Sequence, residues 1–314
     1  MSKNSLLAFV VGPTASGKSK MALELAEEFN SELVNCDSIQ VYKEIDIGSA
    51  KPSKDELERV PHHLYSFVDL KDSYTVSDYY SEAQKTIEDL ELKKKNPIFF
   101  VGGSGFYFQA LEHGMFEIDP ISAEVKNQVR EDLESHGVNF LHQKLKEVDQ
   151  QTASNISEND TYRVTRAMEV FLATGKTMSQ HKNEFEKDSS LKEKREILKI
   201  GLNIDRDRLR EIVKARTDKM LENGLLEEVK DLVDRGFESS FALSSVGYKE
   251  VVQFLKGGLT REEMLYEINK NTMRLAKRQM TWFRRDTQIH WIDANKDFFE
   301  SFKEVKDLIN QKLS

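Results

Sequence analysis

The sequence predicts an α/β protein in which helices flank a parallel sheet, and two patterns along the chain predict it. Short apolar runs with the character of buried strands occupy residues 6–11, 32–36 and 98–101. Helical patterns separate these runs, and strands that alternate with helices favour a parallel sheet with right-handed crossovers. Ligands of such sheets gather at the carboxyl ends of the strands, so we expect a binding crevice there.

A change of character after Asp119-Pro120 predicts a helical insertion. From there to about Lys199 the chain is highly charged, poor in strand signals and helical in pattern. The run at 197–202 is again strand-like and should return to the sheet. We therefore expect a core of residues 1–118 and 199–314, and a helical insertion domain of residues 119–198.

The first strand leads into a phosphate-binding sequence. Residues 12–19 match the pattern G-x-x-x-x-G-K-[ST], and a helical pattern follows them. Backbone N–H groups of such a turn and the positive end of its helix bind phosphate oxygens. Lys18 would reach the phosphates as a cation, and the Ser19 hydroxyl would hold Mg²⁺. The core is thus predicted to be P-loop NTPase-like, with a di- or triphosphate bound by Gly12, Pro13, Thr14, Ala15, Ser16, Gly17, Lys18 and Ser19.

Capping signals predict where three helices begin. Thr75-Val76-Ser77-Asp78 is a capping box that should open a helix reaching about Lys95. Residues 260–263 form a second capping box, which should open a long helix through about Arg285. Between them, Asp205 should cap a further helix.

Composition narrows the class of protein. The chain has 314 residues, a net charge of −8 and a single cysteine, Cys36, so an intrachain disulfide and a cysteine-based zinc site are both excluded. We find no apolar run near the ~20 residues that span a bilayer and no secretory signal pattern. We expect a cytoplasmic protein that neither enters a membrane nor needs an obligate protein partner.

The P-loop alone leaves the chemistry open. It is typical of phosphoryl transfer with ATP and Mg²⁺, as in a small-molecule kinase, or of a regulatory RNA-binding NTPase. Two other strand ends also carry polar groups, namely Asp37-Ser38 and Gly102-Gly103-Ser104-Gly105. Asp37 can cap a helix or form an Asx turn, and the glycine-rich segment can be a bare strand-to-helix turn.

A series of segments resembles one enzyme family. It comprises D-S-x-Q-V-Y at 37–42, residues 46–52, G-G-S-G-F-Y at 102–107, residues 163–170, V-G-Y-K-E at 246–250 and K-R-Q-x-T-W-F-R at 277–284. In this order they resemble the tRNA dimethylallyltransferases, the bacterial tRNA isopentenyltransferases that modify the adenosine next to the anticodon. The resemblance runs from Gly12 to Arg284, nearly the whole chain.

The resemblance implies prenyl transfer rather than phosphoryl transfer. Dimethylallyl diphosphate would occupy the P-loop, and N6 of the adenosine at tRNA position 37 would attack its allylic carbon. Lys18 and Mg²⁺ at Ser19 would stabilise the departing diphosphate, and Asp37 would accept the amine proton. Ser104 stands where the family usually has threonine and keeps the hydroxyl. By the same resemblance, Arg216 helps to bind the diphosphate or the RNA beside it.

Binding of the tRNA anticodon stem-loop is the second implied requirement. Residues 270–285 contain six basic side chains and no acidic one, a local stripe that suits RNA phosphates. The target adenosine should be flipped out of its stack, and glutamine suits the N6/N7 pair of adenine. The expected RNA-binding residues are Asp37, Ser38, Ile39, Gln40, Ser104, Lys126, Arg163, Arg166, Lys277 and Arg278. His62 and His63 are expected to lie in a loop without a metal role.

Overall fold

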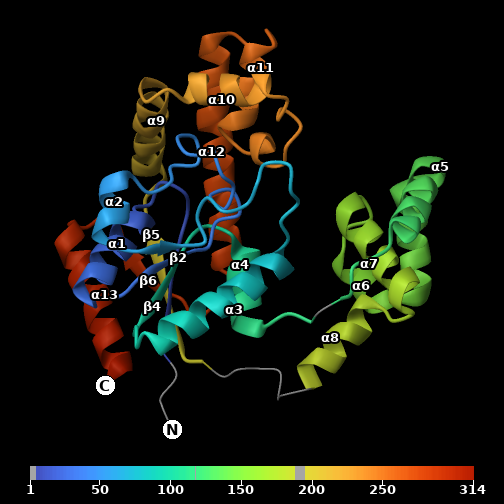
Figure 1. Cartoon of the computed structure of the whole chain (residues 1–314), viewed down its shortest axis with the longest axis horizontal. Coiled ribbons are helices and arrows are strands. Elements are labelled where there is room, and N and C mark those ends of the chain that lie inside the picture. Colours follow the sequence, from blue (N-terminus) through green and yellow to red (C-terminus); the bar gives the residue numbers. More distant parts are fainter. Residues whose placement is uncertain (1–4, 117, 188–194) are drawn as a thin grey trace. The chain divides into compact units, whose positions relative to one another are not determined.

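A six-stranded parallel sheet forms the centre of the larger of two units in this computed structural model (Figure 1). The structure describes residues 5–116, 118–187 and 195–314. All paired strands run parallel. Their order across the sheet is β3 (His62–His63), β2 (Leu33–Asn35), β4 (Ile98–Val101), β1 (Leu7–Val11), β5 (Ile197–Asn203) and β6 (His290–Asp293).

Side chains of β1 alternate between the two faces of the sheet, and each set packs against a different layer of helices. On one face, Ala8 and Val10 pack in a cluster with side chains of α1 (Lys18–Glu28) and α13 (Phe298–Leu313). On the other, Leu7, Phe9 and Val11 pack with α3 (Val76–Leu92), α4 (Gly105–His113) and Phe283. A strand buried on both faces needs a continuous apolar sequence, which explains the unbroken run of hydrophobic residues in β1.

A third cluster builds a helical region beyond the carboxyl ends of the strands. It joins Val41, Tyr42 and Ile45, which follow β2, to side chains of α10, α11 and α12. The helices of this region are α9 (Arg206–Glu222), α10 (Leu225–Asp234), α11 (Tyr248–Leu255) and α12 (Arg261–Phe283), with the short α2 (Lys54–Arg59) after the β2 loop and the 3₁₀ turn η2 (Ala242–Ser244). This packing fixes the loop that follows β2, on which part of the site depends.

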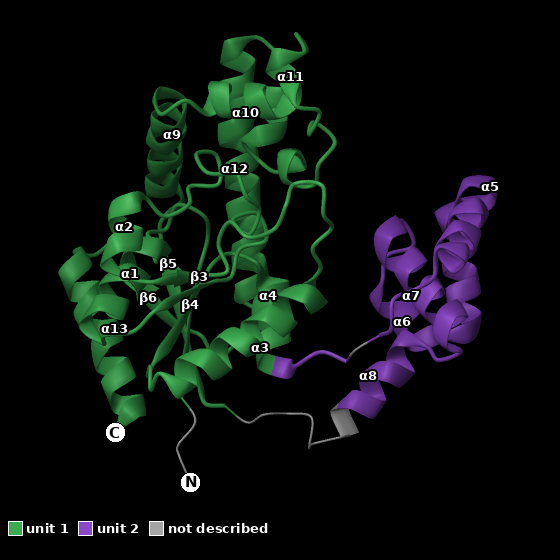
Figure 2. Ribbon diagram, in the orientation of Figure 1, with its two compact units in different colours: residues 1–112, 194–314 green, residues 113–193 purple. Residues whose placement is uncertain are grey.

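The smaller unit is helical and spans residues 113–193 (Figure 2). It contains α5 (Ala123–Val148), α6 (Gln150–Asn155), α7 (Thr161–Thr174) and α8 (Met178–Lys187) around its own apolar cluster. Gly137, with φ +80°, breaks the helical geometry within α5. The chain divides after residues 112 and 193, a few residues before the boundaries expected at 118 and 198.

Most predicted elements are confirmed, and the differences concern the ends of helices, one helix cap and one short strand. Both capping boxes are formed, at Thr75 and at Thr260, and their helices end at Leu92 and Phe283, slightly before the expected positions. Asp205 occupies the N-cap of α9 without a side-chain capping bond. The stretch around His62 is a short edge strand rather than a loop. Among the described residues, no helix combines the length and apolarity needed to cross a membrane.

Candidate active site

The loop between β1 and α1 has the backbone geometry of a phosphate cradle. Gly12 has φ +144°, and a Cβ there would lie 2.9 Å from the carbonyl oxygen of Leu202. Gly17 is the N-cap of α1 with φ +89°, and no side chain caps this helix. The N–H groups of the first turn are therefore available to a bound anion, which the helix dipole also favours.

Ser16 supplies a specific sign that an anion fits this loop. Its Oγ is buried and has no hydrogen-bond partner among the described residues. A buried hydroxyl that makes no hydrogen bond costs about 1–3 kcal/mol. A phosphate oxygen in the cradle would accept that hydrogen bond, so the residues present fit a diphosphate.

Two cations lie beside this loop close to Asp37. Lys18 is buried, and its Nζ donates to the carbonyl oxygen of Pro13 at 2.7 Å. Burial lowers the pKa of Lys18 to about 8, with the Asp37 carboxylate opposing the decrease and Arg216 adding to it. The amine is therefore mostly protonated at neutral pH. Arg216 reaches the loop from α9, where its Nη1 donates to Oγ1 of Thr14 at 3.3 Å.

Neither cation forms an ion pair within 4.0 Å among the described residues. Burial also lowers the pKa of Arg216, and only the Asp37 carboxylate counters this. Two desolvated cations next to a single carboxylate leave excess positive charge in the site. A polyanionic ligand is the natural partner of such a site.

Asp37 lies two residues after β2 and forms an Asx turn, as its place in the sequence allowed. Its Oδ1 accepts the N–H of Ile39 at 2.9 Å, and its own N–H donates to Oδ1 of Asn35 at 2.9 Å. Its second oxygen faces the next strand end, since a Cβ at Gly103 would lie 3.8 Å from Oδ2. The turn and a proton-accepting role use different oxygens, so both are compatible.

Ser104 joins the end of β4 to the end of β2. Its Oγ accepts the N–H of Ser38 at 2.9 Å, and its N–H donates to the carbonyl of Cys36 at 3.1 Å. Gly102 makes this approach possible, because a Cβ there would lie 1.9 Å from the Cys36 oxygen. The hydroxyl hydrogen of Ser104 is left to donate to a ligand.

Gln279 of α12 is a site residue that the sequence reasoning missed. Its Oε1 accepts the N–H of Thr14 at 2.7 Å, and its Nε2 donates to the carbonyl of Gly103 at 3.2 Å. One amide thus bridges the P-loop and the β4 turn. The absence of a Cβ at Gly103 allows the contact, since a Cβ there would lie 2.1 Å from Nε2. Its place inside the K-R-Q-x-T-W-F-R segment was the one signal available.

Replacing Gln279 with Ala should weaken pyrophosphate binding about tenfold, because the Thr14 N–H loses its acceptor and the P-loop loses its support. Isothermal titration with pyrophosphate measures this directly. Gln253→Ala changes an exposed glutamine on α11 and is the matched control. Equal affinity of the Gln279 variant and the wild type would show that the bridge does not shape the cradle.

Most of these groups line one cavity of about 870 Å³ at the carboxyl ends of the strands, although its described lining does not include Ser104. It collects the P-loop residues 14–20, Asp37, Gln40, Arg216 and Gln279, together with the loop at 46–54. Ser38 contributes its N–H to Ser104, whereas Ile39 packs against the third apolar cluster. Ser19 is exposed at its wall, where Mg²⁺ can meet a hydroxyl and ligand phosphates.

A second hollow, a groove of about 870 Å³, lies between α9 and α12. Its described lining has an apolar floor that includes Leu209, Val213 and Met273, and it contains no acidic side chain. The basic residues along it are Arg206, Arg210, Lys214, Lys270, Arg274, Lys277 and Arg284. Arg278 does not line it, so the basic stripe expected on α12 divides between two faces of the helix.

Three of the predicted RNA-binding residues belong to the smaller unit. Lys126 is on α5, and Arg163 and Arg166 are on α7, all within the smaller unit. Arg163 pairs with Asp160 and Arg166 with Glu169, both at 3.4 Å. Phe283, next to the basic residues of α12, is buried in the core.

The two histidines have structural partners. His63 Nε2 lies 2.6 Å from Oε2 of Glu32, an acidic partner that the sequence did not reveal. His62 Nδ1 lies 2.7 Å from the Val60 carbonyl, and burial lowers the pKa of His62. Across the described ranges, no three metal-ligating side chains gather at one point. A metal here would depend on Ser19 and on ligand oxygens.

The fold and the cavity define a P-loop protein with an anion-binding cradle beside a carboxylate. A model of the IPP transferase family matches residues 40–286. The chain is 44% identical over 293 residues to a tRNA dimethylallyltransferase of Bdellovibrio bacteriovorus, which covers 93% of this chain and 94% of that protein. It is 41% identical to a tRNA dimethylallyltransferase of Geobacter metallireducens, covering 91% and 92%. The chain belongs to the IPP transferase family, and it is an enzyme.

Solved structures agree with this assignment. A full-length tRNA isopentenylpyrophosphate transferase of Bacillus halodurans matches with TM-score 0.72 and 34% identity, over 99% of this chain and 97% of that one. A eukaryotic dimethylallyltransferase acting on tRNA matches with TM-score 0.78 and 27% identity, over 92% and 74%. The P-loop NTPase-like fold predicted from the sequence is confirmed.

Proposed function

We propose that the chain transfers a dimethylallyl group from dimethylallyl diphosphate to N6 of the adenosine at tRNA position 37. One observation carries this proposal. Two desolvated cations, Lys18 and Arg216, line the same cavity as the carboxylate of Asp37. The cations can bind the diphosphate, and the carboxylate can accept a proton from the N6 amine of the adenosine. Both reactants can then meet at the ends of neighbouring strands.

In this reaction one bond forms as another breaks. The N6 nitrogen bonds to C1 of the prenyl group, while the C1–O bond breaks and its electron pair leaves with the diphosphate. The N6 proton moves to Oδ2 of Asp37, because Oδ1 is held by the Ile39 N–H. Lys18, Arg216 and the P-loop N–H groups stabilise the charge that gathers on the leaving diphosphate. The Ser104 hydroxyl can donate to the substrate from the β4 turn.

A divalent cation completes the diphosphate site in this proposal. Mg²⁺ bound at the Ser19 hydroxyl and at phosphate oxygens would offset the charge of the leaving group. The donor set fits Mg²⁺, which commonly takes few protein ligands and keeps several waters. We place the reaction in the cytoplasm, where its tRNA substrate is found.

One incubation tests the proposal. Purified protein is mixed with labelled dimethylallyl diphosphate and Mg²⁺, with and without an anticodon stem-loop RNA, and RNA-bound label is counted. We expect label only when RNA carries adenosine at the target position. A parallel reaction with labelled ATP and candidate metabolites tests the kinase alternative, and ATP-dependent phosphorylation without prenyl transfer would overturn the proposal.

The basic groove supplies the RNA-binding surface in this proposal, together with Arg278 and the smaller unit. We expect tRNA affinity to fall steeply with salt, each phosphate contact contributing about −0.7 to −0.9 to the slope of log K against log salt. Replacing Lys214 and Lys277, one on each wall, by Ala should flatten the slope by about one to two units. Pyrophosphate binding should stay unchanged.

Lys303→Ala is the matched control, because Lys303 is an exposed lysine on α13 outside the groove. Its salt slope should equal that of the wild type. A double variant with the wild-type slope would show that the groove is solvated and not occupied by RNA. The RNA path would then have to be sought at Arg278, Lys126, Arg163 and Arg166.

A further inference from the structure

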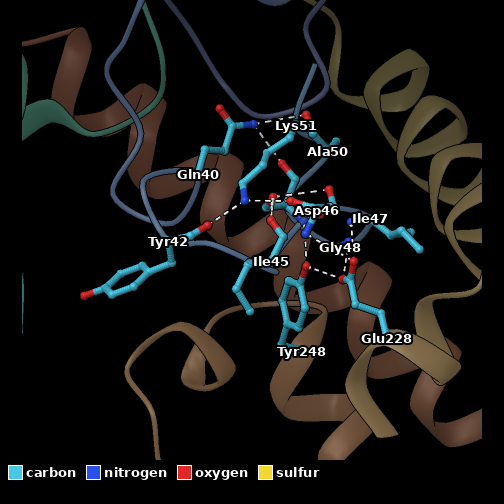
Figure 3. A network of polar contacts seen from close by, with 11 residues as sticks. Gln40, Tyr42, Ile45, Asp46, Ile47, Gly48, Ala50, Lys51, Glu228 and Tyr248 are labelled. Carbon is cyan, nitrogen blue, oxygen red and sulfur yellow. Dashed lines mark hydrogen bonds and ion pairs between the residues drawn. The ribbon is translucent and has the colours of Figure 1, made fainter. Parts of the chain in front are cut away.

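A hydrogen-bonded network outside the catalytic groups holds the loop that follows β2 (Figure 3). The Glu228 carboxylate on α10 accepts three successive backbone N–H groups, those of Asp46 at 3.1 Å, Ile47 at 2.9 Å and Gly48 at 3.4 Å. One carboxylate with three converging donors fixes the backbone of this segment, since bonds to an ionised acceptor are the stronger kind.

Tyr248 extends the network by one residue. Its hydroxyl donates to Oε1 of Glu228 at 2.6 Å and accepts the N–H of Ser49 at 3.2 Å. The side chain is fully buried, and burial together with the Glu228 carboxylate raises its pKa, so the phenol keeps its proton. Gly48 lies on the Tyr248 ring, where a Cβ would come within 2.5 Å of a ring carbon.

The fixed loop in turn fixes the amide of Gln40. Gln40 Nε2 donates to the carbonyl of Ser49 at 2.9 Å and to the carbonyl of Ala50 at 3.0 Å. Two carbonyl acceptors on the same side require the NH₂ group there, because an amide oxygen would meet them with repulsion. The carbonyl oxygen of Gln40 points away from the loop in Figure 3, and Gln40 lines the catalytic cavity.

This arrangement changes what Gln40 can recognise. A free glutamine amide pairs with both N6 and N7 of adenine, but here both hydrogens of Nε2 are already used. Only Oε1 is left, and it accepts a hydrogen bond without donating one. Adenine offers a donor at position 6, whereas inosine and guanine offer an acceptor oxygen there.

We propose that Glu228 and Tyr248 are positioning residues for specificity: through residues 46–50 they hold Gln40 as an acceptor-only group that selects a base bearing a 6-amino donor. The inference rests on the proposed function, because it takes adenosine as the base that enters the cavity. It adds a source of discrimination that lies on α10 and α11, away from the reacting atoms.

Binding of two stem-loop RNAs tests this inference. They differ only at the target nucleotide, which is adenosine in one and purine riboside, lacking the 6-amino group, in the other. The wild type should prefer adenosine about two- to tenfold, the value of one hydrogen bond. Gln40→Ala, Glu228→Gln and Gly48→Ala should each reduce the preference to less than twofold, and Tyr248→Phe should reduce it in part.

The matched control is Glu227→Gln, an exposed carboxylate one residue away, which should keep the wild-type preference. Affinity for pyrophosphate in every variant reports whether the P-loop is intact, and thermal unfolding reports whether the protein is folded. If Glu228→Gln fails to fold, Gly48→Ala and Tyr248→Phe disturb the same network by different routes. A full preference in these folded variants, or in Gln40→Ala, would overturn the inference.

The outcome is separable from that of the proposed function. A wild type that transfers the prenyl group but shows no preference for adenosine would overturn the inference alone. A wild type that prefers adenosine but transfers no prenyl group would overturn the proposed function alone.

Discussion

Replacing Asp37 by Asn is expected to lower the single-turnover rate of prenyl transfer by about 10²–10⁴-fold, the usual cost of losing a general base. Asparagine keeps an Oδ1 that can accept the N–H of Ile39, so the Asx turn survives. What it loses is the second carboxylate oxygen, which faces Gly103 across the cavity. Affinity for the stem-loop RNA should stay within a few-fold, because the proton is accepted only as the C–N bond forms.

The measurement is a rapid-quench single turnover with enzyme in excess, beside an RNA-binding titration. Asp55→Asn, an exposed carboxylate on α2, is the control and should react at the wild-type rate. A rate for Asp37→Asn within a few-fold of wild type would mean that the carboxylate serves the turn alone. Asp37→Ala should be slower still, because it also loses the turn.

Replacing Lys18 by Ala should weaken dimethylallyl diphosphate binding and reduce the rate of transfer by about 10²–10³-fold, as for other buried donors that act on a developing negative charge. Burial makes this amine unusually effective, because a desolvated cation interacts strongly with an anion. Arg216 would remain, so residual binding of the diphosphate is expected.

Separate titrations with pyrophosphate and with RNA locate the loss. Pyrophosphate affinity should fall while RNA affinity stays, and Lys303→Ala on α13 should change neither. Loss of RNA binding with intact pyrophosphate binding would move Lys18 from the diphosphate site to the RNA site. Productive use of ATP by the wild type would also contradict the assignment of the P-loop to a prenyl diphosphate.

The parts of the fold that were predictable carry local signals. β1 and β4 are buried on both faces, so their sequences are continuously apolar. The capping boxes at Thr75 and Thr260 need only four successive residues each. β6 escaped prediction because it pairs with β5 alone and buries only Ile292, which leaves no apolar run to recognise.

The residues of the candidate site likewise differ in whether a local sequence signal identifies them. The P-loop was predictable from its residue pattern alone, and Asp37 and Ser104 from short segments that resemble one enzyme family. Gln279 and Tyr248 lie in segments that carried the resemblance, but their contacts, like those of Glu228, join backbone groups far away in the sequence and could not be predicted locally. Arg216 was assigned by resemblance, and the structure gives it a physical place beside Thr14. The roles of these residues stay predictions until the variants are measured.

The hydrogen bonds of Gln279 that join the P-loop to the β4 turn have a consequence for the synthesis of the protein on the ribosome. The N–H of Thr14 and the amide that holds it are separated by 265 residues. At ~5–20 residues per second, translation needs roughly 13–53 s to cover that separation. The P-loop sequence of a nascent chain is therefore complete long before Gln279 is available to accept the N–H of Thr14. Gln279 arrives with α12, the second-to-last helix of the chain, so this support of the cradle is added only near the end of synthesis.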